Sequence, residues 1–280
     1  LVDRGCLEVT LLGQTVNSYV DRSTGRTIRL ADLLEQVDGI GGLRRLKFVT
    51  NHPRHMTDEL LAAVRDLKRV SPYFHVPAQS GSDAVLRRMR RGYTDSLYRE
   101  MLARIREAVP DAAITSDFIV GFCGETDEDF RKTAELVRDA RFKNSFIFKY
   151  STRPGTAAAE RYADDVPESV KRRRNNELLA IQNAISLEDN RPLLGRTVEI
   201  LVEGPSKVAK KRTSPPAPIM DPMSPEPGTC PAVEGTLQLV GRTVCDRIVV
   251  FDGPETLIGR ILPVVIERID AFTLFGRCGA

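Results

Sequence analysis

The chain has 280 residues, of which 41% are hydrophobic and 28% are charged, and its formal net charge is +3. This composition is typical of a soluble globular protein, and the length predicts one large domain and a smaller one. The weak positive charge excludes nucleic-acid binding through a general basic field, so such binding requires a local patch. No apolar run approaches the roughly 20 residues of a membrane span and no secretory signal opens the chain. We therefore expect a cytoplasmic protein without membrane contact.

The cysteines follow no ligand or disulfide pattern. There are five, an odd number, at Cys6, Cys123, Cys230, Cys245 and Cys278. None belongs to a CxxC or CxxxCxxC sequence, which argues against a disulfide framework and against a locally encoded metal site. His52 and His55 are no better candidates, because Pro53 prevents the helical geometry that would align the two rings. We expect a reducing compartment and no bound metal.

The first part of the chain, residues 1–166, alternates apolar runs with helical patterns. Strands are predicted over residues 7–12, 46–50, 112–120 and 145–150, and in the stretch that begins at residue 73. Helical spacing of apolar residues follows each of the first four strands, with helices opened by Thr57, Thr94 and Thr126. Strands separated by helices indicate parallel βαβ units with right-handed crossovers. We predict an α/β fold, either an open sheet or a partial barrel.

Two loops of the same design indicate where a ligand binds. Residues 73–82 read YFHVPAQSGS and residues 115–126 read TSDFIVGFCGET, so each takes an apolar strand into a glycine-bearing turn before a helix. In α/β folds, ligands bind beyond the carboxyl ends of the strands, where backbone N–H groups and short side chains converge. We predict that the two loops share a cavity. A single loop of this kind is equally well explained as a turn in which Ser82 caps the next helix.

A long polar helix is predicted over residues 167–191 and is interpreted as a linker between two domains. Its basic run at residues 171–174, like the arginines at residues 87–91, either faces phosphates or forms a solvated helix face. The chain then changes to short β-rich runs, at residues 197–202, 235–240, 247–251, 258–262 and 264–269. Their spacing predicts a small closed β-barrel over residues 192–278. Residues 206–234, which are rich in proline, are interpreted as a mobile insertion.

Several motifs occur together in a fixed order. They are EVTLLGQTVNSY at residues 8–19, HVPAQSGS at 75–82, LRRMRRGYT at 86–94, DFIVGFCGET at 117–126 and YSTRPGTAA at 150–158. With these motifs the chain resembles the methylthiotransferase group of radical S-adenosylmethionine (SAM) enzymes, and within it the tRNA-modifying MiaB type. The resemblance covers nearly the whole chain. It implies an incomplete radical SAM (β/α) partial barrel followed by a TRAM domain, a small RNA-binding β-barrel, to which residues 203–206, 241–243 and 247–253 are similar.

The resemblance also implies a reaction and its partners. The family places a methylthio group on C2 of N6-isopentenyladenosine next to the tRNA anticodon, using one SAM as methyl donor and cleaving another to a radical. The implied partners are the anticodon stem-loop of tRNA and donors of sulfur and electrons, and a monomer is expected. The implied SAM-binding residues are Gln14, His75, Gln79, Ser80, Ser82, Asp117, Gly121, Gly124 and Glu125. The implied RNA-binding residues are Arg90, Arg91, Lys207, Arg242 and Arg247.

The chain departs from the family pattern where the iron–sulfur clusters bind. The CxxxCxxC loop that holds the SAM cluster is absent, and so is the N-terminal domain with a second [4Fe-4S] cluster. The chain therefore looks cut at its N-terminus, no catalytic residue is assigned, and it is not expected to catalyse alone. Cys123 stands where the family usually has proline, and Cys245-Asp246 replaces an asparagine of the TRAM pattern. An acidic side chain near phosphate weakens RNA binding.

Two other functions are compatible with the sequence. One is a non-catalytic RNA-binding protein that keeps a remnant of the partial barrel and the TRAM domain. The other is a methylthiotransferase for a different substrate, either threonylcarbamoyl-adenosine in tRNA or an aspartate of a ribosomal protein. The motifs at residues 13–17, 52–53 and 79–81 resemble the tRNA branch more closely than the ribosomal one.

Overall fold

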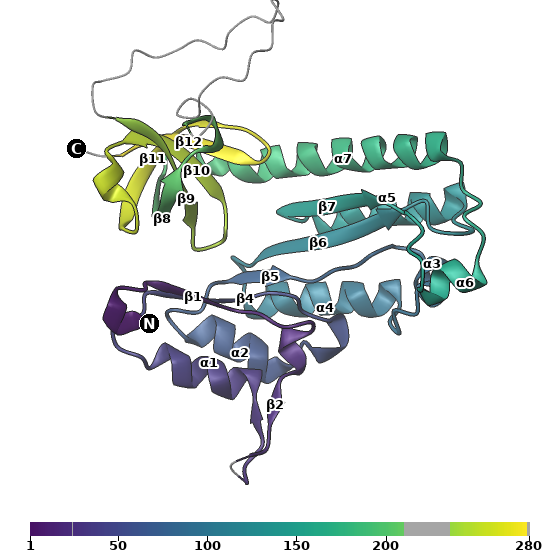
Figure 1. Ribbon diagram of the computed structural model, residues 1–280, viewed down its shortest axis with the longest axis horizontal. Coiled ribbons are helices and arrows are strands. Elements are labelled where there is room, and N and C mark those ends of the chain that lie inside the picture. The colour runs from purple at the N-terminus through teal and green to yellow at the C-terminus, as the bar shows by residue number, and fades with distance from the viewer. Residues whose placement is uncertain (24, 210–235, 279–280) are drawn as a thin grey trace, which may run out of the picture. The chain divides into compact units, whose positions relative to one another are not determined.

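The structure is a computed structural model that describes residues 1–23, 25–209 and 236–278 (Figure 1). The chain forms two compact units, Leu1–Asp189 and Asn190–Ala280. The first unit combines parallel strands with helices, whereas the second is built mainly from strands. The predicted α/β fold followed by a small closed β-barrel is confirmed.

The first unit is organised around parallel strands. They are β1 (Glu8–Leu11), β4 (Arg45–Phe48), β5 (Tyr73–His75), β6 (Ala113–Val120) and β7 (Asn144–Lys149). β1 pairs with β4, and β6 lies between β5 and β7. Backbone hydrogen bonds connect the two groups, from Leu46 N to Arg69 O (2.7 Å) and from Asn51 N to His75 O (3.0 Å). The order β1, β4, β5, β6, β7 is that of a sheet wound by successive βαβ units.

Helices pack on one face of these strands because each carries an apolar stripe. They include α1 (Leu30–Asp38), α2 (Asp58–Asp66), α3 (Asp83–Arg88), α4 (Asp95–Ala108) and α5 (Asp127–Ala140). α2 contacts both α1 and α4, and α4 contacts α5. Figure 1 shows α1, α2 and α4 on one side of the strands. Leu34, Leu61, Ile105 and Val137 from these helices are buried in one cluster with Phe74 of β5.

Side-chain caps set the starts of four helices. Thr57, Thr94 and Thr126 open α2, α4 and α5, as predicted. The hydroxyl of each accepts a hydrogen bond from the backbone N–H three residues further on, and Ser82 does the same at the start of α3. These bonds satisfy N–H groups that have no partner within the helix.

Helix α7 (Glu168–Asn190), predicted as a linker, packs against the first unit. Leu178, Gln182 and Ser186 on one side of it are fully buried. Gln182 Nε2 donates to Phe142 O (2.8 Å), and Ser186 Oγ donates to Lys143 O (2.8 Å). The helix is thus a layer of this unit up to Asp189. Polar residues such as Gln182 and Ser186 occupy part of its buried side, because they form hydrogen bonds with backbone carbonyls there. The sequence of the helix therefore lacks a continuous apolar stripe.

Three short elements were not predicted. They are β2 (Val20–Asp21) and β3 (Ile28–Arg29), which form a hairpin, and helix α6 (Ala157–Arg161). Strands of two residues and a helix of five are too short to display a period of two or of 3.6. No helix in the described part of the chain is long and apolar enough to cross a membrane.

The second unit is a closed barrel. Its described strands are β8 (Thr197–Pro205), β9 (Leu237–Thr243), β10 (Ile248–Gly253), β11 (Ile261–Ile269) and β12 (Thr273–Cys278), in the order β10-β12-β11-β8-β9. Alternate residues such as Ile200, Leu239, Val249 and Ile266 point inward and fill the core. A barrel of this kind leaves no strand edge exposed.

The barrel strands differ in detail from the sequence prediction. The runs predicted at residues 258–262 and 264–269 belong largely to one strand, β11. β12 was not predicted, because Gly276 and Arg277 interrupt its apolar pattern. From residue 210 onward the predicted insertion at 206–234, and Cys230 with it, lies outside the described residues.

Gly81 marks the closest approach between the first predicted loop and helix α5. A Cβ atom at this position would lie 2.5 Å from the backbone oxygen of Lys132. Real Cβ atoms do not approach backbone atoms so closely, so the loop or the helix would have to move. The contact therefore requires glycine for space.

We expect Gly81→Ala to lower the free energy of unfolding by about 1–3 kcal/mol, the usual cost of overpacking. Urea denaturation followed by circular dichroism measures it. Gly41→Ala is the matched control, because a Cβ atom at Gly41 meets no atom within 4 Å; its effect should stay below about 1 kcal/mol. Equal stability of wild type and Gly81→Ala would contradict the close packing of this loop on α5.

Candidate functional site

One face of the β5–β6–β7 sheet is open to solvent. The strand register places His75, Thr115, Asp117, Ile119, Phe146 and Phe148 on this face. Phe146 and Phe148 are 53% and 54% exposed, whereas Phe118 on the opposite face is fully buried. Exposed apolar surface of this kind on an ordered sheet marks a binding face.

His75 and Asp117 form a polar pair on the open face. The Nδ1 atom of His75 lies 3.0 Å from the Thr115 hydroxyl, and its Nε2 atom lies 3.5 Å from Asp117 Oδ2. Both side chains are partly exposed, at 14% and 26%. An imidazole and a carboxylate are therefore held side by side on adjacent strands and remain accessible to a ligand.

Gln79 has a left-handed backbone conformation that residues other than glycine rarely adopt. Its φ is 68° although it is not glycine. Two hydrogen bonds hold it there, from Gln79 N to Asp117 O (2.8 Å) and from Ile119 N to Gln79 O (3.0 Å). Strained backbone that is fixed by its surroundings is concentrated at binding sites. The first loop is thus fastened to β6 directly beside Asp117.

The hydroxyl groups of the first loop bond within the protein. Ser80 Oγ lies 3.1 Å from Thr133 Oγ1, and Ser82 Oγ donates to Asp129 Oδ1. Both serines are buried. These bonds fasten the loop to helix α5, and Ser82 is also the helix cap that the simpler interpretation expected. Direct contact of Ser80 or Ser82 with a ligand stays a prediction.

The second loop, residues 121–125, is held by its own carboxylate. Gly121 and Gly124 have φ values of 72° and 70°, which glycine adopts without strain. Gly121 N donates to Glu125 Oε2 (2.6 Å), and Arg174 Nη1 lies 2.8 Å from the same oxygen. Burial raises the pKa of the Glu125 carboxyl, while the Gly121 N–H and Arg174 oppose that rise. Glu125 thus supports the loop from inside.

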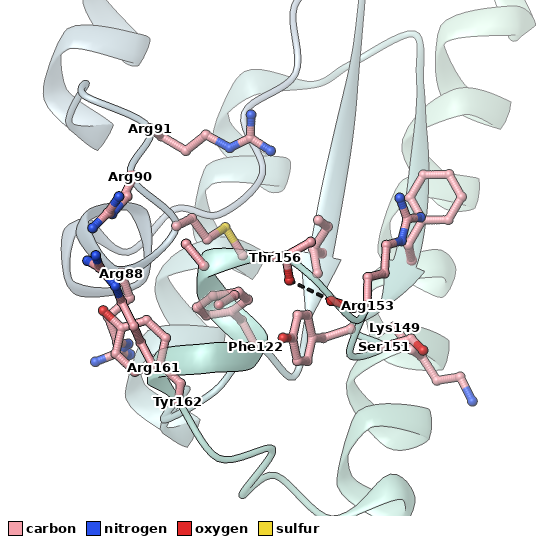
Figure 2. A pocket seen from close by; sticks show the side chains of 16 residues that line it. Arg88, Arg90, Arg91, Phe122, Lys149, Ser151, Arg153, Thr156, Arg161 and Tyr162 are labelled. Atoms are coloured by element: carbon pink, nitrogen blue, oxygen red, sulfur yellow. Dashed lines mark hydrogen bonds between the residues drawn. The ribbon is translucent and has the colours of Figure 1, made fainter.

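A cavity of about 540 Å³ lies beside the two loops (Figure 2). The chain that follows the first loop contributes Arg88, Met89, Arg90 and Arg91, and the second loop contributes Phe122. Ile119 of β6 and the chain from the end of β7 through helix α6 to Tyr162 complete the lining. Arg88 joins the loops, because its Nη2 atom donates to Gly124 O (2.9 Å). Residues 79–82 themselves do not line this cavity.

The cavity is basic and aromatic. Its lining includes Arg88, Arg90, Arg91, Lys149, Arg153 and Arg161 but no aspartate or glutamate. Figure 2 shows Arg88, Arg90 and Arg91 on one side of the hollow and Arg153 with Lys149 on the other. Phe122 stacks edge-on against Tyr150, with ring centroids 4.8 Å apart, and Tyr162 lies 6.3 Å from Phe122. Guanidinium groups bind phosphate and aromatic rings stack on bases, so this lining suits a nucleotide.

The arginines of the cavity differ in whether they pair with a carboxylate. Arg88 lies 3.6 Å from Asp129 in addition to its bond with Gly124. Among the described residues, Arg90, Arg91, Arg153 and Arg161 have no carboxylate oxygen within 4.0 Å. Cations without a carboxylate partner raise the local potential and favour an anionic ligand.

The other predicted residues lie elsewhere. Gln14 is exposed on the loop after β1, and Lys207 is exposed after β8. Arg242 forms ion pairs with Asp246 (2.9 Å) and Glu203 (3.0 Å), and Arg247 Nη1 donates to Asn190 Oδ1 (2.6 Å). The two predicted barrel arginines are therefore already bonded within their unit.

Arg161 and Tyr162 were not foreseen as site residues. They lie on and just after α6, a helix that the sequence does not display. Arg153 and Tyr150 belong to the motif at residues 150–158. That motif was the sequence feature that could have indicated this side of the cavity.

The described residues provide no ligand set for an iron–sulfur cluster. Such clusters are held by several cysteine thiolates. In the described ranges, which include Cys6, Cys123, Cys245 and Cys278, no group of three His, Cys, Asp or Glu side chains could hold a metal ion. No reaction step is therefore assigned to a cluster held by these residues.

Comparisons with known proteins agree with the sequence motifs. A family model described as the radical SAM superfamily matches residues 1–137. The tRNA-2-methylthio-N(6)-dimethylallyladenosine synthase of Rhodopirellula baltica is 55% identical over 99% of this chain and 54% of its own length. The protein of the same name from Desulfitobacterium hafniense is 41% identical over 100% of this chain and 56% of its own length. Among solved structures, coproporphyrinogen III oxidase (HemN) from Escherichia coli matches with a TM-score of 0.44 and 18% identity, over 57% of this chain and 37% of that chain.

The identity to the synthases extends through both units, although the chain spans only about half the length of these relatives. The resemblance inferred from the sequence motifs is thereby confirmed. The chain belongs to the MiaB family of tRNA-2-methylthio-N(6)-dimethylallyladenosine synthases, within the radical SAM superfamily.

Proposed function

We propose that this chain is the SAM-binding and tRNA-binding part of a methylthiotransferase that modifies C2 of N6-isopentenyladenosine next to the anticodon. One observation carries the proposal: an open sheet face with His75 and Asp117 adjoins a basic, aromatic cavity at the carboxyl ends of the strands. Family membership supports the choice of reaction. The remaining elements of the proposal are a cytoplasmic location, a monomer, and external donors of sulfur and electrons.

The open face suits SAM in its chemistry. SAM carries a sulfonium, an ammonium group, a carboxylate, ribose hydroxyls and a purine. The Asp117 carboxylate accepts hydrogen bonds from ribose hydroxyls or the ammonium group, and its negative charge favours the cationic ligand. His75 orients Asp117, and the exposed Phe146 and Phe148 offer apolar surface to the purine or the methionine chain. When bound, SAM supplies the methyl group and the radical precursor.

The cavity suits RNA next to the bound SAM. Arg90, Arg91, Arg153 and Arg161 line it without carboxylate partners among the described residues. Their guanidinium groups bind phosphates, and Phe122 and the tyrosines stack on a base that has left its helix. A substrate base is thereby brought to the strand ends, where the cofactor lies.

We expect Asp117→Ala to weaken SAM binding by about tenfold to a hundredfold, the loss typical of a hydrogen bond to a charged group. Equilibrium dialysis with labelled SAM measures the affinity. Asp111→Ala removes an exposed carboxylate from the turn before β6 and should leave the affinity unchanged. Equal affinities of wild type and Asp117→Ala would exclude Asp117 from the SAM site.

Replacing Arg153 and Arg161 together by glutamine should weaken binding of an anticodon stem-loop. Loss of two phosphate contacts lowers the slope of log K against log salt concentration by about 1.4 to 1.8. Fluorescence anisotropy of a labelled stem-loop at several salt concentrations measures this slope. The control, Arg138→Gln with Arg172→Gln, removes the same charge from exposed positions on α5 and α7. Equal slopes for the two double variants would mean that Arg153 and Arg161 make no phosphate contact.

The proposed reaction is tested with the complete gene product in cells that lack their own enzyme of this family. We expect 2-methylthio-N6-isopentenyladenosine to appear in hydrolysed tRNA, detected by mass spectrometry, and to disappear with Asp117→Ala. A methylthio group found instead on threonylcarbamoyl-adenosine or on a ribosomal protein would reassign the substrate. Absence of every methylthio product, with RNA binding retained, would favour the non-catalytic alternative.

A further inference from the structure

The four basic side chains at residues 171–174 divide into two that are buried and two that are exposed. Lys171 and Arg174 are three residues apart and therefore lie on the same side of α7. The side chain of each is only 4% exposed. Arg172 is exposed, and the Arg173 side chain is 55% exposed. The sequence left open whether this run binds phosphates. Lys171 and Arg174 are buried, so only the other two cations are accessible to a phosphate.

Arg174 forms hydrogen bonds with the C-terminal end of the second loop. Its Nη1 atom donates to the carbonyl oxygen (3.1 Å) and to Oε2 (2.8 Å) of Glu125, while Nη2 donates to Asp127 Oδ1 (3.0 Å). The same Oε2 atom of Glu125 accepts from Gly121 N. One guanidinium group thus ties both ends of residues 121–125 to helix α7.

Lys171 connects this loop with the end of β7. A Cβ atom at Gly121 would lie 2.3 Å from Lys171 Cγ, so the lysine stem lies directly on the glycine backbone. The Nζ atom donates to both oxygens of Asp164 (2.5 and 2.7 Å) and to Tyr150 O (3.3 Å). It also lies 5.3 Å from the centre of the Tyr150 ring. The neighbouring Asp165 accepts from Gly124 N (2.6 Å).

These bonds fix three segments that carry the aromatic wall of the cavity. Phe122 lies on the loop, Tyr150 follows β7, and Tyr162 follows α6 two residues before Asp164. The rings contact one another, and the charged groups behind them set their positions. Buried ion pairs add little net stability compared with apolar packing, so their presence here is better explained by geometry than by stability.

We infer that Lys171 and Arg174 are positioning residues: they hold the second loop in the geometry that binds SAM, and behind it the aromatic wall that faces the proposed RNA cavity. The inference rests on the proposed function, because it takes SAM as the ligand of this loop. It requires that removing the Arg174–Glu125 pair disorders residues 121–125 and lowers SAM affinity without unfolding the unit.

The test uses Glu125→Gln with Arg174→Met, which removes both charges and leaves no unpaired buried ion. Arg172→Met is the matched control, since it makes the same change at an exposed position of the same run. Hydrogen exchange of the peptide that covers residues 121–126 is measured without ligand, and SAM affinity by equilibrium dialysis. We expect exchange to be about tenfold faster or more and affinity to fall about tenfold to a hundredfold. The melting temperature and the control should stay near wild type.

Unchanged exchange at residues 121–126, or unchanged SAM affinity with faster exchange, would overturn the inference. Faster exchange throughout the unit would overturn it too, because the pair would then be structural only. If the wild-type chain binds no SAM, the proposed function fails, while exchange still decides whether Arg174 fixes the loop. Should the double variant not fold, Arg174→Lys replaces it, since lysine keeps the charge beside Glu125 but loses the second arm to Asp127. Local loosening in that variant supports the inference, and wild-type exchange overturns it.

Discussion

The position of β6 between β5 and β7 is the constraint on which the first unit depends. Successive side chains of β6 point to opposite faces of the sheet. Phe118 therefore enters the core, while Asp117 and Ile119 lie on the open face beside their neighbours in β7. The bond from Gln79 N to Asp117 O fastens the first loop to this strand, and the second loop begins where the strand ends. A shift of register by one residue would exchange the core face with the binding face.

Charge pairing separates the basic groups that support the structure from those that are available to a ligand. Lys171 and Arg174 are buried against carboxylates, and Arg242 of the barrel is paired with Asp246 and Glu203. Arg153 and Arg161 line the cavity without such partners among the described residues. A count of positive charges therefore gives no measure of RNA affinity, because an arginine already paired with a carboxylate gains less from a phosphate.

The two units differ in the groups that they offer to a ligand. The first unit holds the open sheet face and the cavity, which together suit a cofactor and a nucleotide. The second is a closed barrel whose predicted RNA-binding arginines are bonded internally. The proposed RNA contacts of the barrel are then expected at exposed groups such as Lys207. The ligand contacts of highest affinity are expected in the first unit.

The sequence by itself determined the alternation of strands and helices, the helix caps at Thr57, Thr94 and Thr126, the barrel and the family. These features depend on local spacing and on motifs of neighbouring residues, which a linear reading captures. Only the tertiary structure decided that Ser82 bonds to Asp129, that Arg174 faces inward and that Arg161 joins the cavity. Those contacts join residues far apart in the chain, and packing selects them among many groups of the same chemical type.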